Sequence, residues 1–362
     1  MPEIIFAINP GSTTTKTALY RRDVCLFEQS LSHSAAELAP YRTIAAQLPM
    51  RLAAIENALT AALAKAGHAD TRAISAVVSR GGLLHPVVSG VYEVNEDMLA
   101  DLTKARYGEH ASNLGALIAS VLGERFGCPA YIVDPVVVDE LEPAARLTGL
   151  PEIKRRSVFH ALNQKAVARQ AAADLNCKYE DINLIVVHMG GGISIAAHRR
   201  GRVIDVNNAL EEGPFSPERA GSLPTLPLLE LAFSGQYDSA ALRRKINGQG
   251  GMAALLGTND CRMVEDLAAQ RPDYALVLDA MAYQTAKWIG AMATVLKGEI
   301  KAVVLTGGMA RSKYLTERIH NSVAFLAPVL IYPGEKEMAA LISGVLRVLA
   351  GQEKPGEYKA EV

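Results

Sequence analysis

Two glycine-rich turns stand about half a chain apart, and each follows an apolar run. Residues 9–16 read Asn-Pro-Gly-Ser-Thr-Thr-Thr-Lys, and residues 188–194 read His-Met-Gly-Gly-Gly-Ile-Ser. A strand-like run, a short polar turn and a second strand-like run follow each of them, which predicts a β-hairpin in both places. Glycine, serine and threonine at a hairpin tip direct N–H and hydroxyl donors outward, which suits a phosphate. Either turn alone fits an ordinary hairpin, but the repetition indicates a nucleotide held between two related domains.

Arginine, histidine and aspartate side chains stand at the ends of other predicted strands and turns. Arg80 follows the strand predicted over residues 73–79 and precedes two glycines, and Arg219 follows the proline-rich turn 213–217. A planar guanidinium forms paired hydrogen bonds with a carboxylate or a phosphoryl group, so both arginines are candidates for an anion site. Most arginines are solvated surface residues. The glycine-rich and proline-rich turns beside Arg80 and Arg219 distinguish these two from such surface arginines.

Composition excludes several classes of protein. With 37 Lys and Arg against 38 Asp and Glu, the net charge of −1 gives no electrostatic basis for binding nucleic acid or an anionic membrane. The four cysteines are scattered, which favours free thiols in a cytoplasmic protein over a disulfide framework. The apolar start of the chain lacks a basic region, so no secretory signal is expected. The apolar stretch 275–296 contains Asp279 and Lys287, and we predict a buried helix there.

Strand-like and helical patterns alternate along both halves, which predicts an α/β fold. The helices expected from apolar periodicity are 45–66, 113–126, 238–247, 262–270, 273–297 and 337–349. At 362 residues the chain is long for one core. We predict a first domain over 1–148 with the C-terminal helix, about 338–362, packed back on it, and a second domain over 149–337.

The turns after Ile8, Val187 and Leu305 together resemble the acetate and sugar kinase/heat-shock/actin superfamily. The segments 79–82, 156–160 and 218–222 narrow the resemblance to its carboxylate kinases. Within these, residues 109–113, Phe-His-Ala-Leu-Asn after Val158 and His-Met-Gly-Gly-Gly-Ile-Ser are more similar to butyrate kinases than to acetate kinases. The resemblance covers essentially the whole chain and implies duplicated ribonuclease-H-like (actin-like ATPase) domains with a nucleotide cleft between them.

The activity implied by this resemblance is reversible, in-line phosphoryl transfer from ATP to a short-chain fatty acid, butyrate or a branched relative. An acetate or propionate kinase would use the same catalytic residues and remains the alternative. A nucleotide-switch ATPase of the actin or chaperone type is a more distant one, for which the paired arginine turns would have no purpose. Preferred chain length, physiological direction and oligomer size stay open at this point.

The resemblance also assigns roles to individual residues. Arg80, Asp134, His160 and Arg219 would be catalytic, with His160 donating a hydrogen bond in the transition state. The residues expected at ATP or ADP are Asn9, Gly11, Ser12, Thr13, Lys16, His188, Gly190, Gly191, Gly192, Asp260, Arg262, Gly307 and Gly308. Gly191 and Ser222 stand where acetate kinases have Asn and Asp, so those two side-chain roles are not carried over.

Magnesium is the metal that this chemistry implies, since it prefers hard oxygen ligands shared with nucleotide phosphates. Asn9 would assist it from the first domain and Glu337 from the second, with Glu335 as the alternative carboxylate. Without the resemblance, Asn9 would be a turn former and Glu337 a carboxylate at a helix N-terminus. A homodimer joined through the second domain is expected from the resemblance and from the apolar helix 274–296.

Overall fold

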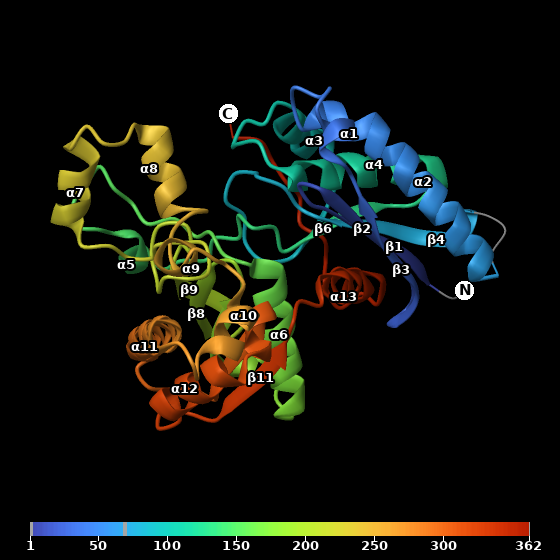
Figure 1. The fold of residues 1–362 in the computed structure, drawn as a ribbon. Helices are drawn as coiled ribbons and strands as arrows, with labels where there is room; N and C mark the ends of the chain where they lie inside the picture. Colours follow the sequence, from blue (N-terminus) through green and yellow to red (C-terminus); the bar gives the residue numbers. More distant parts are fainter. Residues whose placement is uncertain (1–2, 68–70, 362) are drawn as a thin grey trace. The chain divides into compact units, whose positions relative to one another are not determined.

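The computed structural model describes residues 3–67 and 71–361, which divide into two compact units (Figure 1). The first unit comprises Met1–Val138 and Lys336–Val362, and the second comprises Asp139–Glu335. The chain therefore leaves the first unit after Val138, ten residues before the boundary at residue 148 that the sequence analysis predicts. It also returns after Glu335, two residues before the predicted end of the second domain.

The first unit is built on a six-stranded sheet with the order β3-β2-β1-β4-β6-β5. Its strands are β1 (Ile4–Pro10), β2 (Thr14–Arg21), β3 (Val24–Ser32), β4 (Ile74–Arg80), β5 (Val91–Glu93) and β6 (Ala130–Val133). The first three are antiparallel neighbours, whereas β4 lies parallel to β1 and β6 lies parallel to β4.

The second unit repeats this plan in a five-stranded sheet with the order β11-β10-β7-β8-β9. Its strands are β7 (Asn183–Met189), β8 (Ile193–Arg199), β9 (Arg202–Val206), β10 (Ala302–Gly307) and β11 (Val329–Pro333). The three hairpin strands are again antiparallel neighbours, whereas β10 lies parallel to β7 and β11 lies parallel to β10. In each unit the second hairpin, β2–β3 or β8–β9, carries a register shift at the equivalent place. The shift lies between Leu19 and Tyr20 in the first unit and between Ala197 and His198 in the second. The predicted internal repeat is therefore confirmed at the level of strand order.

Helices cover both faces of the first sheet. The helices α2 (Leu48–Lys65), α3 (Glu96–Thr103) and α4 (Leu114–Phe126) form one layer, and α13 (Glu337–Leu349) packs on β1, β4 and β6. Ile132 belongs to the core beneath α4, whereas the next residue, Val133, contacts Gly344 of α13. Successive residues of a strand point to opposite faces, which explains why β6 is apolar throughout. The short α1 (Ala35–Leu38) follows β3.

The second sheet is covered in the same way. Ile185 and Val187 of β7 pack with α11 (Pro272–Val295) and α12 (Lys313–Val323) in one core. Leu184 and Val186 pack with α6 (Ala161–Asp174) in another core, on the opposite face. The remaining helices of this unit are α5 (Pro143–Arg146), α7 (Thr225–Phe233), α8 (Ser239–Ile246), α9 (Met252–Leu256) and α10 (Cys261–Leu267). No helix in the described part of the chain is both long enough and apolar enough to cross a membrane.

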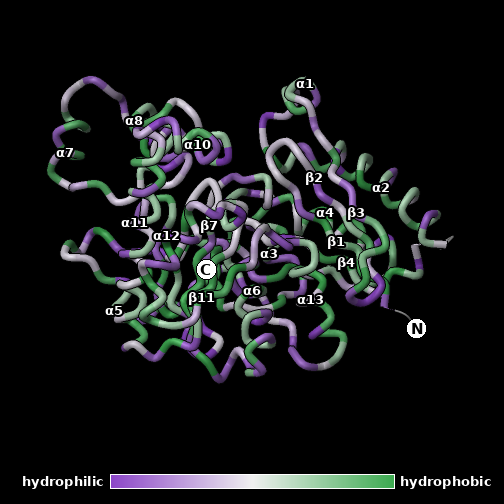
Figure 2. Tube along the Cα trace, turned by 60° about the horizontal axis from the view of Figure 1, so that its bottom comes forward, coloured by the Kyte–Doolittle hydropathy of each residue, from purple (hydrophilic) through white to green (hydrophobic). Residues whose placement is uncertain are grey.

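The surface helix α7 is apolar but buries none of its residues (Figures 1 and 2). Leu226 is 71% exposed and Phe233 is 83% exposed. By contrast α11, which the sequence analysis suggested as an uncovered surface, directs Leu278, Met281 and Ile289 into the core. Exposed apolar side chains of the second unit therefore lie on α7 as well as on α11, where Leu276 and Tyr283 are exposed.

A fully buried histidine, His198 on β8, ties the sheet to α6. Its Nδ1 lies 2.7 Å from the hydroxyl of Tyr179, and its Nε2 lies 3.1 Å from Oε1 of Gln164. Burial, and secondarily the charges of Lys165 and Arg169, lower the pKa of His198 well below its ordinary value of 6.5. The imidazole is therefore neutral, with Nε2–H donating to the glutamine and Nδ1 accepting from the tyrosine.

This arrangement predicts a loss of stability in mild acid. The unfolded chain binds more protons than the native one below the unfolded pKa of about 6.5, so stability is full above that pH and falls below it, by up to about 1.4 kcal/mol per pH unit. Urea titrations at pH 7.5, 6.5 and 5.5, followed by the fluorescence of the single tryptophan, Trp288 of α11, measure this slope. The His198→Asn variant should show a flatter slope between pH 6.5 and 5.5, and parallel slopes would contradict the assignment.

Candidate active site

The first glycine-rich turn is the tip that joins β1 to β2. The N–H of Gly11 donates to the carbonyl of Thr14 at 2.7 Å, which closes the turn. Ser12 and Thr13 at its summit are exposed, and Lys16 is exposed on β2 opposite Asn9. The tip therefore offers hydroxyl and amide donors to solvent, as a phosphate site requires.

A buried polar cluster lies at the carboxyl ends of β1 and β4. The amide nitrogen of Asn9 donates to Oε2 of Glu337 at 2.6 Å, and the guanidinium of Arg80 pairs with Oε1 of Glu337 at 3.1 Å. Asn9 and Glu337 are each 7% exposed. A carboxylate buried to this degree is retained because the arginine and the amide compensate its charge.

The structure corrects one expectation about this cluster. Glu337 was expected to act from the second domain, but it begins α13 and belongs to the first unit, together with Asn9 and Arg80. The segment that follows β11 crosses to the first unit after Glu335, and sequence spacing alone does not reveal on which residue a chain crosses.

Arg80 is the last residue of β4, and close packing fixes the strand end that carries it. A Cβ at Gly115 would lie 2.2 Å from the carbonyl oxygen of Arg80, so only glycine lets α4 approach this closely. His110 lies near enough for the charge of Arg80 to lower its pKa, although burial is the larger cause. The backbone N–H of Ser112 donates to Nδ1 of His110. His110 is therefore a neutral imidazole beside Arg80. It belongs to the motif 109–113, but the sequence analysis assigned it no role in the site.

Asp134 follows β6 directly and is 2% exposed. Its Oδ1 accepts hydrogen bonds from Oγ of Ser89 at 2.6 Å and from the N–H of Gly90 at 2.9 Å. Its φ of 39° is unusual for a residue other than glycine and indicates backbone strain at the strand end. The expected position near Arg80 or a metal stays a prediction, since the carboxylate is shown here bound to the Ser89–Gly90 turn.

The second glycine-rich turn joins β7 to β8 and lies under an arginine. The N–H of Gly190 donates to the carbonyl of Gly192 at 2.9 Å, and the hydroxyl of Ser216 donates to the carbonyl of Gly191 at 2.6 Å. A Cβ at Gly192 would lie 2.0 Å from Nη1 of Arg219, so the guanidinium rests directly on this glycine. Burial lowers the pKa of Arg219, partly offset by the neighbouring carboxylate of Glu218. The structure thus joins two of the predicted elements, the second tip and Arg219.

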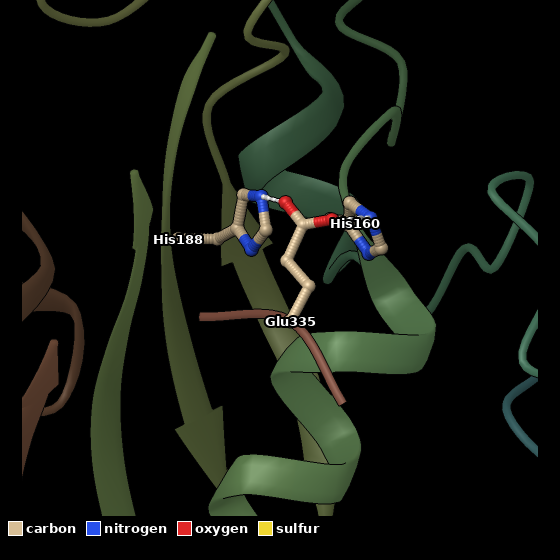
Figure 3. Close-up of side chains that lie close together, drawn as sticks. All are labelled: His160, His188 and Glu335. Carbon is tan, nitrogen blue, oxygen red and sulfur yellow. Dashed lines mark ion pairs between the residues drawn. The ribbon is translucent and has the colours of Figure 1, made fainter. Parts of the chain in front are cut away.

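Two histidines and a glutamate adjoin the second tip (Figure 3). The imidazoles of His160 and His188 stack with ring centroids 4.4 Å apart. The carboxylate of Glu335 lies 3.1 Å from Nε2 of His188 and 3.9 Å from Nε2 of His160. Asn163 lies 2.8 Å from Nδ1 of His188 through its Oδ1 and orients that ring. The cluster therefore places two imidazoles and a carboxylate beside the tip.

The two glutamates differ in the metal ions that they suit. Asn9 and Glu337 offer hard oxygen ligands, which Mg²⁺ prefers. Glu335 faces two imidazoles, a donor set that suits first-row transition ions better than Mg²⁺. The assignment of the magnesium carboxylate to Glu337 or Glu335 stays a prediction.

The third glycine pair lies at the end of β10. Gly307 has a φ of 91°, and a Cβ there would lie 2.3 Å from the carbonyl oxygen of Met189, so the turn packs directly against β7. A Cβ at Gly308 would meet open space. Asp260 caps α10 by accepting from the N–H groups of Arg262 and Met263, and both Asp260 and Arg262 are exposed. Their expected contact with the base or ribose stays a prediction.

The chain is similar in sequence to proteins of a known family. The sequence model of the Acetokinase family matches residues 151–330. "Butyrate kinase 2" of Clostridium acetobutylicum is 50% identical over 357 residues, which cover 98% of this chain and 99% of the relative. "Probable butyrate kinase" of Coprothermobacter proteolyticus is also 50% identical, over the same shares of the two chains.

Solved structures show the same fold. An acetate kinase of Porphyromonas gingivalis superposes with a TM-score of 0.76 at 20% identity, covering 96% of this chain and all of the other. A propionate kinase of Francisella tularensis gives 0.71 at 18% identity, covering 94% and 98%. The predicted duplicated α/β fold is confirmed by these structures and by the two sheets. With half of its residues shared over nearly the whole length, the chain belongs to the acetokinase family and, within it, to the butyrate kinases.

Proposed function

We propose that the protein transfers the γ-phosphoryl group of ATP to the carboxylate of a short-chain fatty acid, butyrate or a branched four-carbon relative. The products are ADP and an acyl phosphate, and the reaction is reversible. The principal support is the 50% identity with butyrate kinases over 98% of the chain. Acetate or propionate phosphorylation is the alternative, since solved relatives at lower identity carry those names.

The nucleophile needs no base. A fatty acid is ionised at pH 7, because the pKa of a carboxyl group lies near 4 to 5. One carboxylate oxygen attacks the γ-phosphorus while the bond to the β-phosphate oxygen breaks, and ADP leaves with those electrons. The protein must therefore position two anions and neutralise charge on the phosphoryl oxygens rather than abstract a proton.

The cationic groups of the site divide these tasks. Arg80 would bind the carboxylate of the acid, exchanging its contact with Glu337 for the substrate. Arg219, fixed on Gly192, would bind the phosphoryl group in transfer. His160 would donate a hydrogen bond to the same oxygens, with its ring held in a stack with His188.

The nucleotide would lie along the glycine turns. Donors of Ser12, Thr13 and Lys16 in one unit and of Gly190–Gly192 in the other suit phosphates. Gly307 and Gly308 would lie behind the adenosine. Mg²⁺ would be held by Glu337 and the amide oxygen of Asn9 and would neutralise the phosphate oxygens. The four cysteines of the described chain are free thiols, which is consistent with a reducing compartment such as the cytoplasm.

Trapping the product tests this function and its chain length together. The protein is incubated with ATP, Mg²⁺, hydroxylamine and acetate, propionate, butyrate or isobutyrate, and the hydroxamate formed from the acyl phosphate is measured. Each buried methylene contributes about 0.8 kcal/mol, and pockets discriminate by about 1–3 kcal/mol per group. We expect butyrate to exceed acetate in kcat/KM on the order of 10²-fold. The highest kcat/KM for acetate would overturn the chain length, and no hydroxamate with any acid would overturn the reaction.

Replacing either site arginine tests the mechanism. Arg80→Ala and Arg219→Ala should each lower kcat on the order of 10³-fold, the scale of an arginine acting on a transferring phosphoryl group. Lysine should restore little, because a point charge does not reproduce the guanidinium fork. Arg271→Ala is the matched control, since Arg271 is exposed and its guanidinium contacts the carboxylate of Asp273 and the ring of Tyr274, away from the glycine turns. A folded Arg219→Ala protein with near-normal kinetics would remove that residue from the mechanism.

We also propose a homodimer joined through the second unit. An apolar helix with no buried residue, α7, is costly to leave in water, and a second copy of the chain would cover it. Exposed apolar residues also lie on α11, at Leu276 and Tyr283.

A double substitution on α7 tests the dimer. Leu226→Asp with Phe233→Asp should give a monomer mass in light scattering at micromolar concentration, where the unmodified protein gives twice that mass. The control is Phe325→Asp, an equally exposed apolar residue elsewhere in the same unit. A monomer mass for the unmodified protein would contradict the proposal.

A further inference from the structure

Arg51, in the first turns of α2, is a fully buried arginine directly beneath the first glycine-rich tip. It is 0% exposed, the largest of the fully buried side chains in the described residues. Its Nη1 donates to the carbonyls of Gly11 at 2.8 Å and Thr14 at 3.2 Å, and its Nη2 donates to the carbonyl of Ser12 at 2.9 Å. One guanidinium thus holds three of the four carbonyls of the tip.

The fourth carbonyl is held by the neighbouring strand. The backbone N–H at His33 donates to the carbonyl of Thr13 at 2.8 Å. In a trans peptide the C=O and the following N–H point in opposite directions. Because Arg51 holds the carbonyls of Gly11 and Ser12, the N–H groups of Ser12 and Thr13 point away from Arg51. Because Ser12 and Thr13 are exposed, these amides point outward from the tip.

The other contacts of Arg51 are neutral as well. Its Nε and Nη2 both donate to Oε1 of Gln47, at 3.1 and 2.9 Å, and its Nη1 donates to Oγ1 of Thr15 at 3.0 Å. Burial lowers the pKa of Arg51, yet an arginine remains charged. The same charge contributes to lowering the pKa of His33, for which burial is the larger cause. A positive charge therefore lies under the tip on neutral acceptors.

We infer that Arg51 is a positioning residue for the nucleotide phosphate. It fixes the tip so that the N–H groups of Ser12 and Thr13 are directed to one phosphate group, and its buried charge attracts that anion without touching it. The inference rests on the proposed function, which makes this tip a nucleotide site. Successive N–H groups in a turn form a recognised anion-binding concavity, and a buried charge acts strongly because protein surrounds it.

Lysine does not fit this role. The Nε, Nη1 and Nη2 of Arg51 donate hydrogen bonds to three backbone carbonyls, one side-chain amide oxygen and one hydroxyl, in directions set by the planar fork. A lysine ammonium has three donors at one point and reaches fewer of these acceptors. Arg51→Lys consequently keeps the charge and loses the geometry of the tip.

Binding of MgADP, measured by calorimetry without any fatty acid, tests the inference. Arg51→Lys should raise the Kd for ADP at least tenfold, and Gln47→Ala, which removes an acceptor that orients the fork, should raise it less. In the hydroxamate assay the KM for ATP should rise in parallel, whereas the KM for the acid stays within about twofold. The matched control is Leu59→Ala, which removes packing two turns further along α2 and should leave the Kd unchanged.

Rescue separates positioning from general stability. Ethylguanidinium added to Arg51→Ala should restore part of the ADP affinity, and it should do nothing for Leu59→Ala. If Arg51→Ala does not fold, Arg51→Lys and Gln47→Ala decide the question. An ADP affinity of Arg51→Lys within twofold of the unmodified protein, or an equal loss in Leu59→Ala, would overturn the inference. Because this assay contains no acid, a failure of the fatty-acid reaction would leave its result intact.

Discussion

A peptide turn can present its N–H groups to a phosphate only if its carbonyls are satisfied on the other side. The peptide plane imposes this opposition, and an unsatisfied buried carbonyl costs free energy comparable to a lost hydrogen bond. Both glycine-rich tips meet the constraint, with an inner N–H closing each turn and side chains from elsewhere holding the carbonyls. The residues behind the turns therefore decide whether the turns can bind an anion at all.

The two units meet that constraint with different side chains on the same scaffold. The sheets share strand order and even the position of a register shift, yet the first tip rests on the charged Arg51 and the second on the neutral hydroxyl of Ser216. In the second unit the cation lies directly against the backbone of the tip instead, where the guanidinium of Arg219 rests on Gly192. An arginine behind a turn can orient donors, whereas one in front of it can also bind the ligand. In the proposed function Arg51 therefore has a positioning role and Arg219 a direct one.

Sequence predicted the parts of this protein that depend on local patterns. Apolar periodicity located α2, α4 and α11, and the α13 helix was placed at its observed bounds, Glu337–Leu349. The glycine-rich turns and Arg219 could be assigned to one candidate site because each lies in a short recognisable motif. Arg51 could not be found this way, since it stands about forty positions after the tip it supports, on a helix whose pattern reads as ordinary core. The same limit applied to α7, where only the structure shows that none of its residues is buried and that Leu226 and Leu229 are exposed.

The pair Glu335 and Glu337 shows why spacing alone left the metal carboxylate undecided. Both follow β11 and only Lys336 separates them, but the chain passes from the second unit to the first at that residue. Glu335 is consequently held by the imidazoles of its own unit, while Glu337 is held by Asn9 and Arg80 of the other. Each carboxylate is fixed by partners that sequence places more than a hundred residues away.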